Sequence, residues 1–248
     1  MVYHRHMIQD TITYDCRVCG STNIVRNGTN KCGRAQYHCK DCGAYRVLEP
    51  IIGYSAEQKQ TILDTYKERA SLRGLARIFG VARQTVLRWL KERVQHLPDL
   101  KDTLAPPRTD DVLELDELWS FVLKKTAKRW LWLALCRRTR QVVAFVIGDR
   151  SDDTCRRLWN KIPESYRACH SFSDFWAAYQ RVFDSETHQS VGKESGETAH
   201  VERWNNTLRQ RLARFVRKTL SFSKSDVYHH IVTKWFIAEY NLAISLTM

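Results

Sequence analysis

The sequence predicts a multidomain protein with a small metal-binding module, an all-α module and an α/β domain with a mixed sheet. Three observations lead to this fold class. Two cysteine pairs lie near the N-terminus, residues 55–97 have helical periodicity, and from Val112 apolar strand patterns alternate with helical ones. The 248 residues are enough for more than one domain. We therefore expect modules at 1–52, 53–97 and 112–248, with a proline-rich linker at 98–111.

The first module is defined by its cysteines. Two C-x2-C pairs stand about twenty residues apart and are formed by Cys16, Cys19, Cys39 and Cys42. A two-residue gap lets one turn aim both thiolates at one ion, and two such pairs complete a tetrahedron around Zn²⁺. Four thiolates leave no open position, so we expect a zinc ribbon with a structural ion. Cys32 and His38 are further possible ligands, which we expect to be bystanders.

The second module has the pattern of a helix-turn-helix. Ser55 can cap a first helix. In the segment Leu72–Leu90, Ala76 is small where two helices would cross, and Gly80 permits the tight turn. The second helix leaves four side chains to face a DNA major groove: Arg83, Gln84, Thr85 and Arg88. The alternative is a plain helical hairpin with a solvated basic face.

The third module combines strands and helices. Apolar segments bounded by polar turns predict strands at Val112–Phe121, Arg129–Cys136, Val142–Ile147, Tyr166–Phe172 and Thr187–Val191. Helical patterns lie at Asp152–Lys161, Phe175–Phe183, Glu197–Arg217 and Ser225–Ser245. Three strands followed by alternating helix and strand indicate an α/β domain with a mixed sheet.

The charge of the chain favours a polyanionic partner. The formal net charge is +13, and nucleic acids are the usual partners of so basic a protein, although an ordinary basic enzyme is the alternative. The helix that starts near Glu197 and the residues after it carry candidate DNA contacts: Arg203, Asn206, Arg209, Arg211, Arg214, Arg217 and Lys218. No apolar run approaches the length of a membrane span, and the N-terminus lacks the apolar segment of a signal peptide. We expect a soluble, intracellular protein with no membrane partner.

Carboxylates inside the apolar strand Val112–Phe121 are the candidate catalytic groups. Alternate residues of a strand share a face, so Glu114 and Asp116 lie on one face and Glu117 on the other. Asp174 follows a later apolar segment, and Glu202 stands near the start of the basic helix. Carboxylates from two strands and a helix can bind two Mg²⁺ ions, which prefer oxygen ligands and act on phosphodiesters. Spacing alone does not establish this site, because acidic residues are common and most of them lie on solvated surfaces.

Taken together, these motifs resemble transposases of the insertion-sequence-one family. The resemblance covers almost the whole chain, including the cysteine pairs, the tripeptide Arg26-Asn27-Gly28 and the helix-turn-helix. Downstream it rests on Glu114-Leu115-Asp116-Glu117-Leu118-Trp119, on Asp174-Phe175-Trp176 and on Val201-Glu202-Arg203-Trp204-Asn205-Asn206. The last of these runs on to Gln210 and is highly specific.

The resemblance implies a ribonuclease-H-like catalytic domain with an Asp-Asp-Glu triad. The matching positions are Asp116, Asp174 and Glu202, which would bind Mg²⁺ or Mn²⁺. Glu114 and Glu117 compete with Asp116 for the first position. The family often carries glycine after the second aspartate, whereas Phe175 stands here, so a changed turn is expected at that point.

The implied activity is DNA strand cleavage and strand transfer at the terminal inverted repeats of an insertion sequence. The partners would be transposon ends and target DNA in the cytoplasm of a prokaryote, at its nucleoid. The protein would act as a homodimer or higher oligomer, since two ends must be held together. A transcriptional repressor of the element and a nuclease without joining activity remain alternatives from other functional classes.

Overall fold

The chain folds into two compact units. The computed structural model describes residues 13–30, 33–48 and 53–247. One unit comprises Met1–Ser55 and the other Ala56–Met248. The described part of the first unit holds an antiparallel sheet of β1 (Ile24–Thr29), β2 (Ala35–Cys39) and β3 (Tyr45–Arg46), with β2 in the centre.

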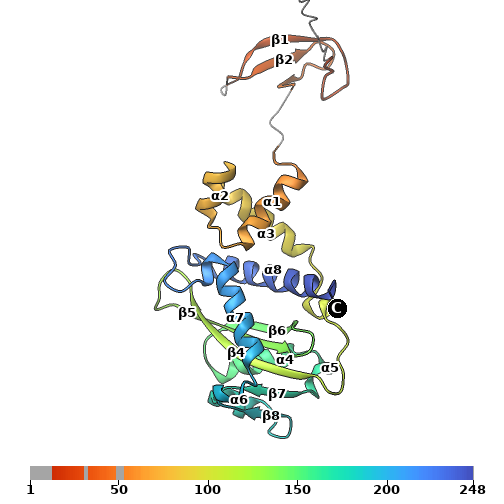
Figure 1. The fold of residues 1–248 in the computed structure, drawn as a ribbon. Coiled ribbons are helices and arrows are strands. Elements are labelled where there is room, and N and C mark those ends of the chain that lie inside the picture. The colour runs from red at the N-terminus through yellow and green to blue at the C-terminus, as the bar shows by residue number, and fades with distance from the viewer. Residues whose placement is uncertain (1–12, 31–32, 49–52, 248) are drawn as a thin grey trace, which may run out of the picture. The chain divides into compact units, whose positions relative to one another are not determined.

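The second unit begins with three helices, α1 (Ala56–Lys67), α2 (Leu72–Phe79) and α3 (Arg83–Gln95) (Figure 1). The Ser71 hydroxyl accepts a hydrogen bond from the Gly74 amide and caps the start of α2. Gly80 has a φ of 66°, a left-handed conformation that glycine adopts without steric cost, and it ends α2. Leu75, Val86 and Leu90 are fully buried between the helices. The helical part of the expected helix-turn-helix is thus present.

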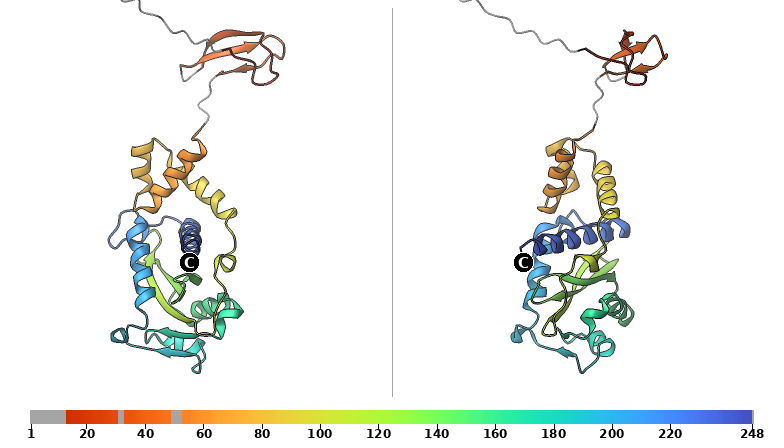
Figure 2. Two further views of the ribbon diagram at one scale, coloured as in Figure 1. Left: turned by 45° about the vertical axis from the view of Figure 1, so that its right-hand side comes forward. Right: turned by 90° about the vertical axis from the view of Figure 1, so that its right-hand side faces the viewer.

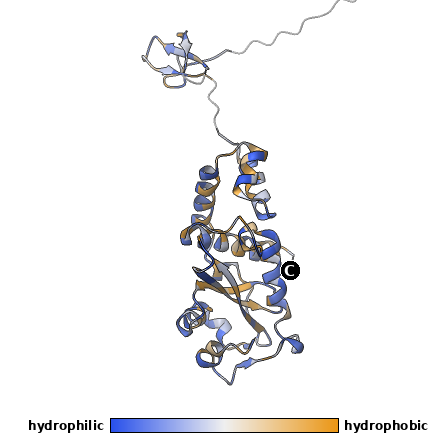
Figure 3. Cartoon of the chain, turned by 90° about the vertical axis from the view of Figure 1, so that its left-hand side faces the viewer, coloured by the Kyte–Doolittle hydropathy of each residue, from blue (hydrophilic) through white to orange (hydrophobic). Residues whose placement is uncertain are grey.

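A mixed five-stranded sheet forms the centre of the second unit, as expected. Its strands are β4 (Val112–Phe121), β5 (Lys128–Cys136), β6 (Val142–Gly148), β7 (His170–Ser173) and β8 (His188–Ser190), in the order β6-β5-β4-β7-β8. The first three are antiparallel neighbours, whereas β7 lies parallel to β4 and β8 parallel to β7. Strands β5 and β6 are nearly continuous apolar runs, because both faces of the sheet are covered there (Figure 3).

Different helices cover the two faces (Figures 1 and 2). Helices α4 (Asp152–Lys161), α5 (Glu164–Arg167) and α6 (Ala177–Val182) pack on one face, in a core that includes Trp132 and Tyr179. Helices α7 (Ala199–Arg211) and α8 (Asp226–Ser245) cover the other. Helix α8 buries Trp235 and Phe236 within its own chain, so this apolar segment helps to cover the sheet. No helix of the described residues is long and apolar enough to span a membrane.

Two predicted elements differ from the structure. The segment Tyr166–Phe172 is not one strand, because Tyr166 belongs to the short helix α5 and β7 starts only at His170. The basic helix is shorter than Glu197–Arg217. It ends at Arg211, where Leu212 adopts an extended conformation and a 3-10 turn follows at Ala213–Phe215. The break lets Leu212 and Phe215 reach the core, and burial of these apolar side chains outweighs the helical propensity of the arginines around them.

The segment 98–111, predicted as a linker, is packed against the sheet. It forms a 3-10 turn at Leu100–Thr103. The buried Gln141 side chain donates to the Thr103 carbonyl at 2.7 Å and accepts from the Ala105 amide at 2.8 Å. Asp111 pairs with Arg138 at 2.6 Å, and its carboxylate is fully buried. These contacts tie the segment down, so it does not behave as a free connection between the helices and the sheet.

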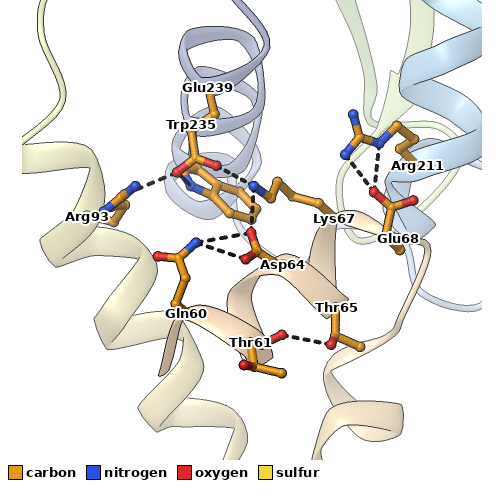
Figure 4. Close-up of polar contacts among 10 residues, drawn as sticks. All are labelled: Gln60, Thr61, Asp64, Thr65, Lys67, Glu68, Arg93, Arg211, Trp235 and Glu239. Atoms are coloured by element: carbon orange, nitrogen blue, oxygen red, sulfur yellow. Dashed lines mark hydrogen bonds and ion pairs between the residues drawn. The ribbon is translucent and has the colours of Figure 1, made fainter. Parts of the chain in front are cut away.

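The three N-terminal helices dock on α8 through a polar cluster (Figure 4). Glu239 of α8 is at its centre and accepts hydrogen bonds from Lys67 (2.6 Å), Arg93 (3.1 Å) and Trp235 (2.8 Å). Beside it, Glu68 pairs with Arg211 at the end of α7 at 2.6 Å. The ring of Tyr66 stacks on Trp235, with centroids 6.2 Å apart. Helices α1–α3 and the sheet therefore belong to one compact unit.

Candidate functional site

The four predicted cysteine ligands converge in the first unit. Their sulfur atoms all lie within 4.8 Å of one another. Each pair is held by the same turn: the Gly20 amide donates to the Cys16 carbonyl at 2.7 Å, and the Gly43 amide donates to the Cys39 carbonyl at 3.0 Å. Both glycines have positive φ, near 70°, which the turn requires.

The sulfur positions fit a tetrahedral zinc ion. A zinc–sulfur bond of about 2.3 Å gives a tetrahedron with edges of about 3.8 Å. The Cys16 and Cys42 sulfurs are 3.7 Å apart, and those of Cys19 and Cys39 are 3.6 Å apart. His38 is not in this group, because its ring stacks on Tyr45 with centroids 4.3 Å apart. Cys32 lies outside the described residues.

Asp116 stands in the middle of β4 and faces α7. One carboxylate oxygen accepts the Glu117 amide at 2.8 Å, and the other accepts the Asn205 side-chain amide at 2.7 Å. Burial raises the pKa of Asp116, and the negative charges of Asp174 and Glu202 raise it further, against the lowering effect of these hydrogen bonds. A raised carboxylate pKa is what we expect where acidic groups converge without a cation.

Asp174 is brought to Asp116 by the strand register. Strand β7 runs parallel to β4 with Val112 opposite His170 and Glu114 opposite Phe172, so Asp174 follows at the level of Asp116. The Trp176 amide donates to the Asp174 carboxylate at 3.0 Å and fixes the turn after the strand. Phe175, in the position where glycine was expected, has 65% of its surface exposed. Exposure of the ring lets this turn form without glycine.

Glu117 was expected on the opposite face of β4 from Asp116, as a competitor for the first position of the triad. Its side chain does lie on the opposite face from Asp116, where it accepts hydrogen bonds from Tyr179 at 2.8 Å and from Arg150 at 2.7 Å. Nevertheless, oxygens of Asp116, Glu117 and Asp174 all lie within 4.8 Å of one another. Burial and the charge of Asp174 raise the pKa of Glu117 to about 7. These carboxylates come together where β7 ends beside the middle of β4, and they approach from both faces of the sheet.

Glu202 occupies the first turn of α7, as expected, but it is not part of that close group. Its charge reaches Asp116, because it contributes to the raised pKa of that residue. Of the three predicted catalytic carboxylates, the structure therefore brings Asp116 and Asp174 together and leaves Glu202 nearby on the covering helix.

Glu114 anchors the start of α7, a role that the sequence did not reveal. Its fully buried carboxylate accepts bonds from the backbone amides of His200 (2.8 Å) and Val201 (3.0 Å), from the His200 ring (2.6 Å) and from Arg137 (2.7 Å). A carboxylate at a helix N-terminus satisfies unpaired amides and interacts favourably with the helix dipole. Glu114 thus fixes the helix that carries Glu202.

Asn205 is a second residue that sequence reasoning missed. It lies three residues after Glu202 on α7 and is 6% exposed. Its amide nitrogen binds Asp116, whereas its Oδ1 is buried and has no hydrogen-bond partner among the described residues. The only signal in the sequence is the spacing of three, which puts Glu202 and Asn205 on neighbouring positions of a helix surface.

The predicted DNA-contacting side chains of the helix-turn-helix lie at the start of α3. Arg83, Gln84 and Arg88 are exposed and Thr85 is half-buried, while Val86 and Leu90 point into the core. Arg88 forms a long, exposed ion pair with Glu92, one turn further along α3, at 3.7 Å. A polar, basic surface at the start of this helix is therefore accessible.

The predicted DNA-contacting residues after Glu202 fall into two groups. Arg203, Asn206, Arg217 and Lys218 are exposed, and Arg209 is half-buried. Arg211 and Arg214 instead make contacts within the chain. Arg211 pairs with Glu68, and Arg214 donates to the Tyr228 carbonyl at 3.1 Å and to the Tyr66 hydroxyl. These two arginines hold the helix-turn-helix against α7 and are less available to phosphates than expected.

Comparison with known proteins bears on this region. Residues 112–242 match the family described as IS1 transposase. The InsB protein of insertion element iso-IS1n from Shigella dysenteriae is 39% identical over 129 residues, which make up 52% of this chain and 95% of that protein. The InsB protein of insertion element IS1 from Shigella flexneri is 39% identical over 116 residues, 47% of this chain and 86% of that protein. The 112–242 match contains Asp116, Asp174 and Glu202 and leaves the cysteine cluster and helices α1–α3 outside it.

Proposed function

Because this chain belongs to the IS1 transposase family, we propose that it binds the terminal inverted repeats of its insertion sequence and catalyses metal-dependent DNA strand cleavage and strand transfer. The observation that carries the proposal is the convergence of Asp116 and Asp174 where β7 ends beside the middle of β4, beneath the helix that bears Glu202. The order of three antiparallel strands and two parallel ones supports a ribonuclease-H-like fold for this domain.

Asp116, Asp174 and Glu202 would hold divalent cations, Mg²⁺ or Mn²⁺. The donor set fits, since these hard ions prefer carboxylate oxygens. The raised pKa of Asp116 and the unpartnered Asn205 oxygen beside it also fit a site that is completed by a cation. When bound, a pair of such ions activates an attacking oxygen and stabilises a leaving oxygen at a phosphodiester.

In this proposal, other residues of the chain hold the three carboxylates in position by hydrogen bonds. The Glu117 amide and the Asn205 side chain fix the orientation of the Asp116 carboxylate, and the Trp176 amide does the same for Asp174. Glu114 holds the start of α7 and with it the height of Glu202 above the sheet. Carboxylates held in this way need little rearrangement during the reaction, which favours catalysis by preorganisation.

DNA recognition is divided between two regions in this proposal. The start of α3, with Arg83, Gln84, Thr85 and Arg88, would read base edges of the terminal repeats. The exposed residues Arg203, Asn206, Arg217 and Lys218 and the half-buried Arg209, on α7 and after it, would contact phosphates of any DNA. The cysteine cluster would hold a structural zinc, and at least two chains would assemble on paired ends in the bacterial cytoplasm, at the nucleoid.

The test uses labelled DNA carrying a transposon end, with Mg²⁺ and a target plasmid. The wild-type protein should release cleaved ends and join them to the target. Asp116→Asn, Asp174→Asn and Glu202→Gln should each abolish both steps and leave end binding in a gel shift intact. Sequence-specific binding without cleavage would indicate a repressor, and cleavage without joined products would indicate a nuclease. Either result from the wild-type protein would overturn the proposal.

A further inference from the structure

Asn205 has an unexplained atom. Its side chain is inside the protein, its Nδ2 donates to Asp116 at 2.7 Å, and its Oδ1 is buried with no partner among the described residues. A buried carbonyl oxygen without a donor costs free energy, so native proteins rarely leave one unless a water, an ion or a ligand completes it.

The orientation of the amide is set by its surroundings. If the oxygen and nitrogen were exchanged, the amide oxygen would face a carboxylate oxygen of Asp116 with no hydrogen between them. The bond to Asp116 therefore assigns Nδ2 to that side, and Oδ1 must face another direction. Arg209, one turn further along α7, also has a buried Nε without a partner, so the two groups do not satisfy one another.

The position of Asn205 relates the free oxygen to the carboxylate cluster. Residues three apart on a helix are neighbours on its surface, so Asn205 and Glu202 face the same region. Asp116, which Asn205 holds, is one of the three carboxylates whose oxygens lie within 4.8 Å. A neutral oxygen at this place can add a ligand without adding negative charge to a cluster that already repels itself.

We propose that Asn205 is an additional ligand of the divalent cation, bound through Oδ1, while its Nδ2 keeps Asp116 in position. The inference rests on the proposed function, because it concerns the same cation. An amide oxygen belongs to the hard, neutral ligands that Mg²⁺ and Mn²⁺ accept together with carboxylates. In this arrangement one side chain both orients a ligand and serves as one.

The first experiment measures Mn²⁺ binding to the full-length, zinc-loaded protein by calorimetry, without DNA. Asn205→Ala should weaken binding roughly 10- to 100-fold, the loss typical when groups that support a metal site are removed. The matched control is Gln210→Ala, because Gln210 is an exposed amide side chain on the same helix. It should bind Mn²⁺ like the wild type. Thermal melts of the zinc-loaded variants without added Mn²⁺ establish that each variant is folded.

The second experiment separates a ligand from a residue that only orients Asp116. In Asn205→Cys a thiolate replaces the amide, and a soft thiolate favours Cd²⁺. The four-cysteine cluster also takes up Cd²⁺ and gives a sulfur-to-metal charge-transfer band in every variant. The band that matters is therefore the additional ultraviolet band, which Asn205→Cys should give and which should be missing in the wild type and in Gln210→Cys. Asp174→Asn combined with Asn205→Cys should lose the additional band. If Asn205→Ala weakens Mn²⁺ binding but Asn205→Cys gives no additional band, the ligand role is wrong.

The outcomes also separate this inference from the proposed function. If Asp174→Asn removes Mn²⁺ binding but Asn205→Ala leaves it unchanged, only the role of Asn205 is overturned. If the wild-type protein binds no Mn²⁺ that depends on Asp174, both the cation site and the role of Asn205 are overturned.

Discussion

Glu239 provides a quantitative test of how the helix-turn-helix is joined to the sheet domain. Its side chain is 13% exposed and accepts three hydrogen bonds, two of them from charged groups. Glu239→Ala leaves the Trp235 indole without its acceptor and Lys67 with Asp64 as its remaining partner, at 2.8 Å. The cost of removing Glu239 lies between the cost of losing a surface ion pair and that of breaking a buried one. We therefore expect Glu239→Ala to lower the free energy of unfolding by about 2–3 kcal/mol.

The assay is thermal unfolding followed by tryptophan fluorescence. For a unit of this size the expected loss corresponds to a fall in Tm of about 4–12 °C. The control is Glu68→Ala, which removes an ion pair with Arg211 from a side chain that is 63% exposed, and should cost about 0–1 kcal/mol. Equal melting temperatures for the two variants would refute the account of Glu239 as the centre of this interface.

Three further predictions concern other parts of the chain. Cys39→Ser should remove the one tightly bound zinc and unfold the first module, because a structural zinc contributes folding free energy directly; elemental analysis and circular dichroism measure this, and a variant that stays folded would contradict it. Arg83→Ala should reduce the preference for terminal-repeat over random DNA by about 1–3 kcal/mol in competition gel shifts, whereas equal weakening on both DNAs would rule out base reading. Burial lowers the pKa of His229 to about 3, so the unfolded chain binds its proton more tightly. The stability that neutral His229 gives above pH 6.5 should be lost as the pH falls, by up to about 3 kcal/mol at pH 4, and urea melts of His229→Gln should lack this slope.

Elements with strong local patterns could be predicted from the sequence. Strand β4 and helix α4 have the predicted ends, because a largely apolar segment bounded by polar turns defines the strand and a Ser151 cap defines the start of the helix. The cysteine cluster also follows from spacing alone. The end of α7 could not be predicted, because the chain leaves the helix at Leu212 to bury residues in a core formed by distant segments.

The site was predictable in its acidic residues but not in their supports. Glu114 and Asn205 act through contacts between β4 and α7, which are about 90 residues apart in the chain. The periodicity of a single strand or helix cannot predict contacts between segments so far apart in the sequence. Alternation placed Glu117 on the opposite face from Asp116, as the structure does, but it could not show that Asp174, just after β7, comes close to the carboxylates of both faces.

The most direct test of the central claim is the location of Mn²⁺ by anomalous diffraction in crystals of the protein with transposon-end DNA. The account predicts an anomalous peak bound by Asp116 and Asp174, with the Glu202 carboxylate drawn in to complete the site. Glu117 should keep its bonds to Arg150 and Tyr179. A peak coordinated by Glu117 while Glu202 stays apart, or no peak between Asp116 and Asp174, would contradict the assignment of the catalytic triad.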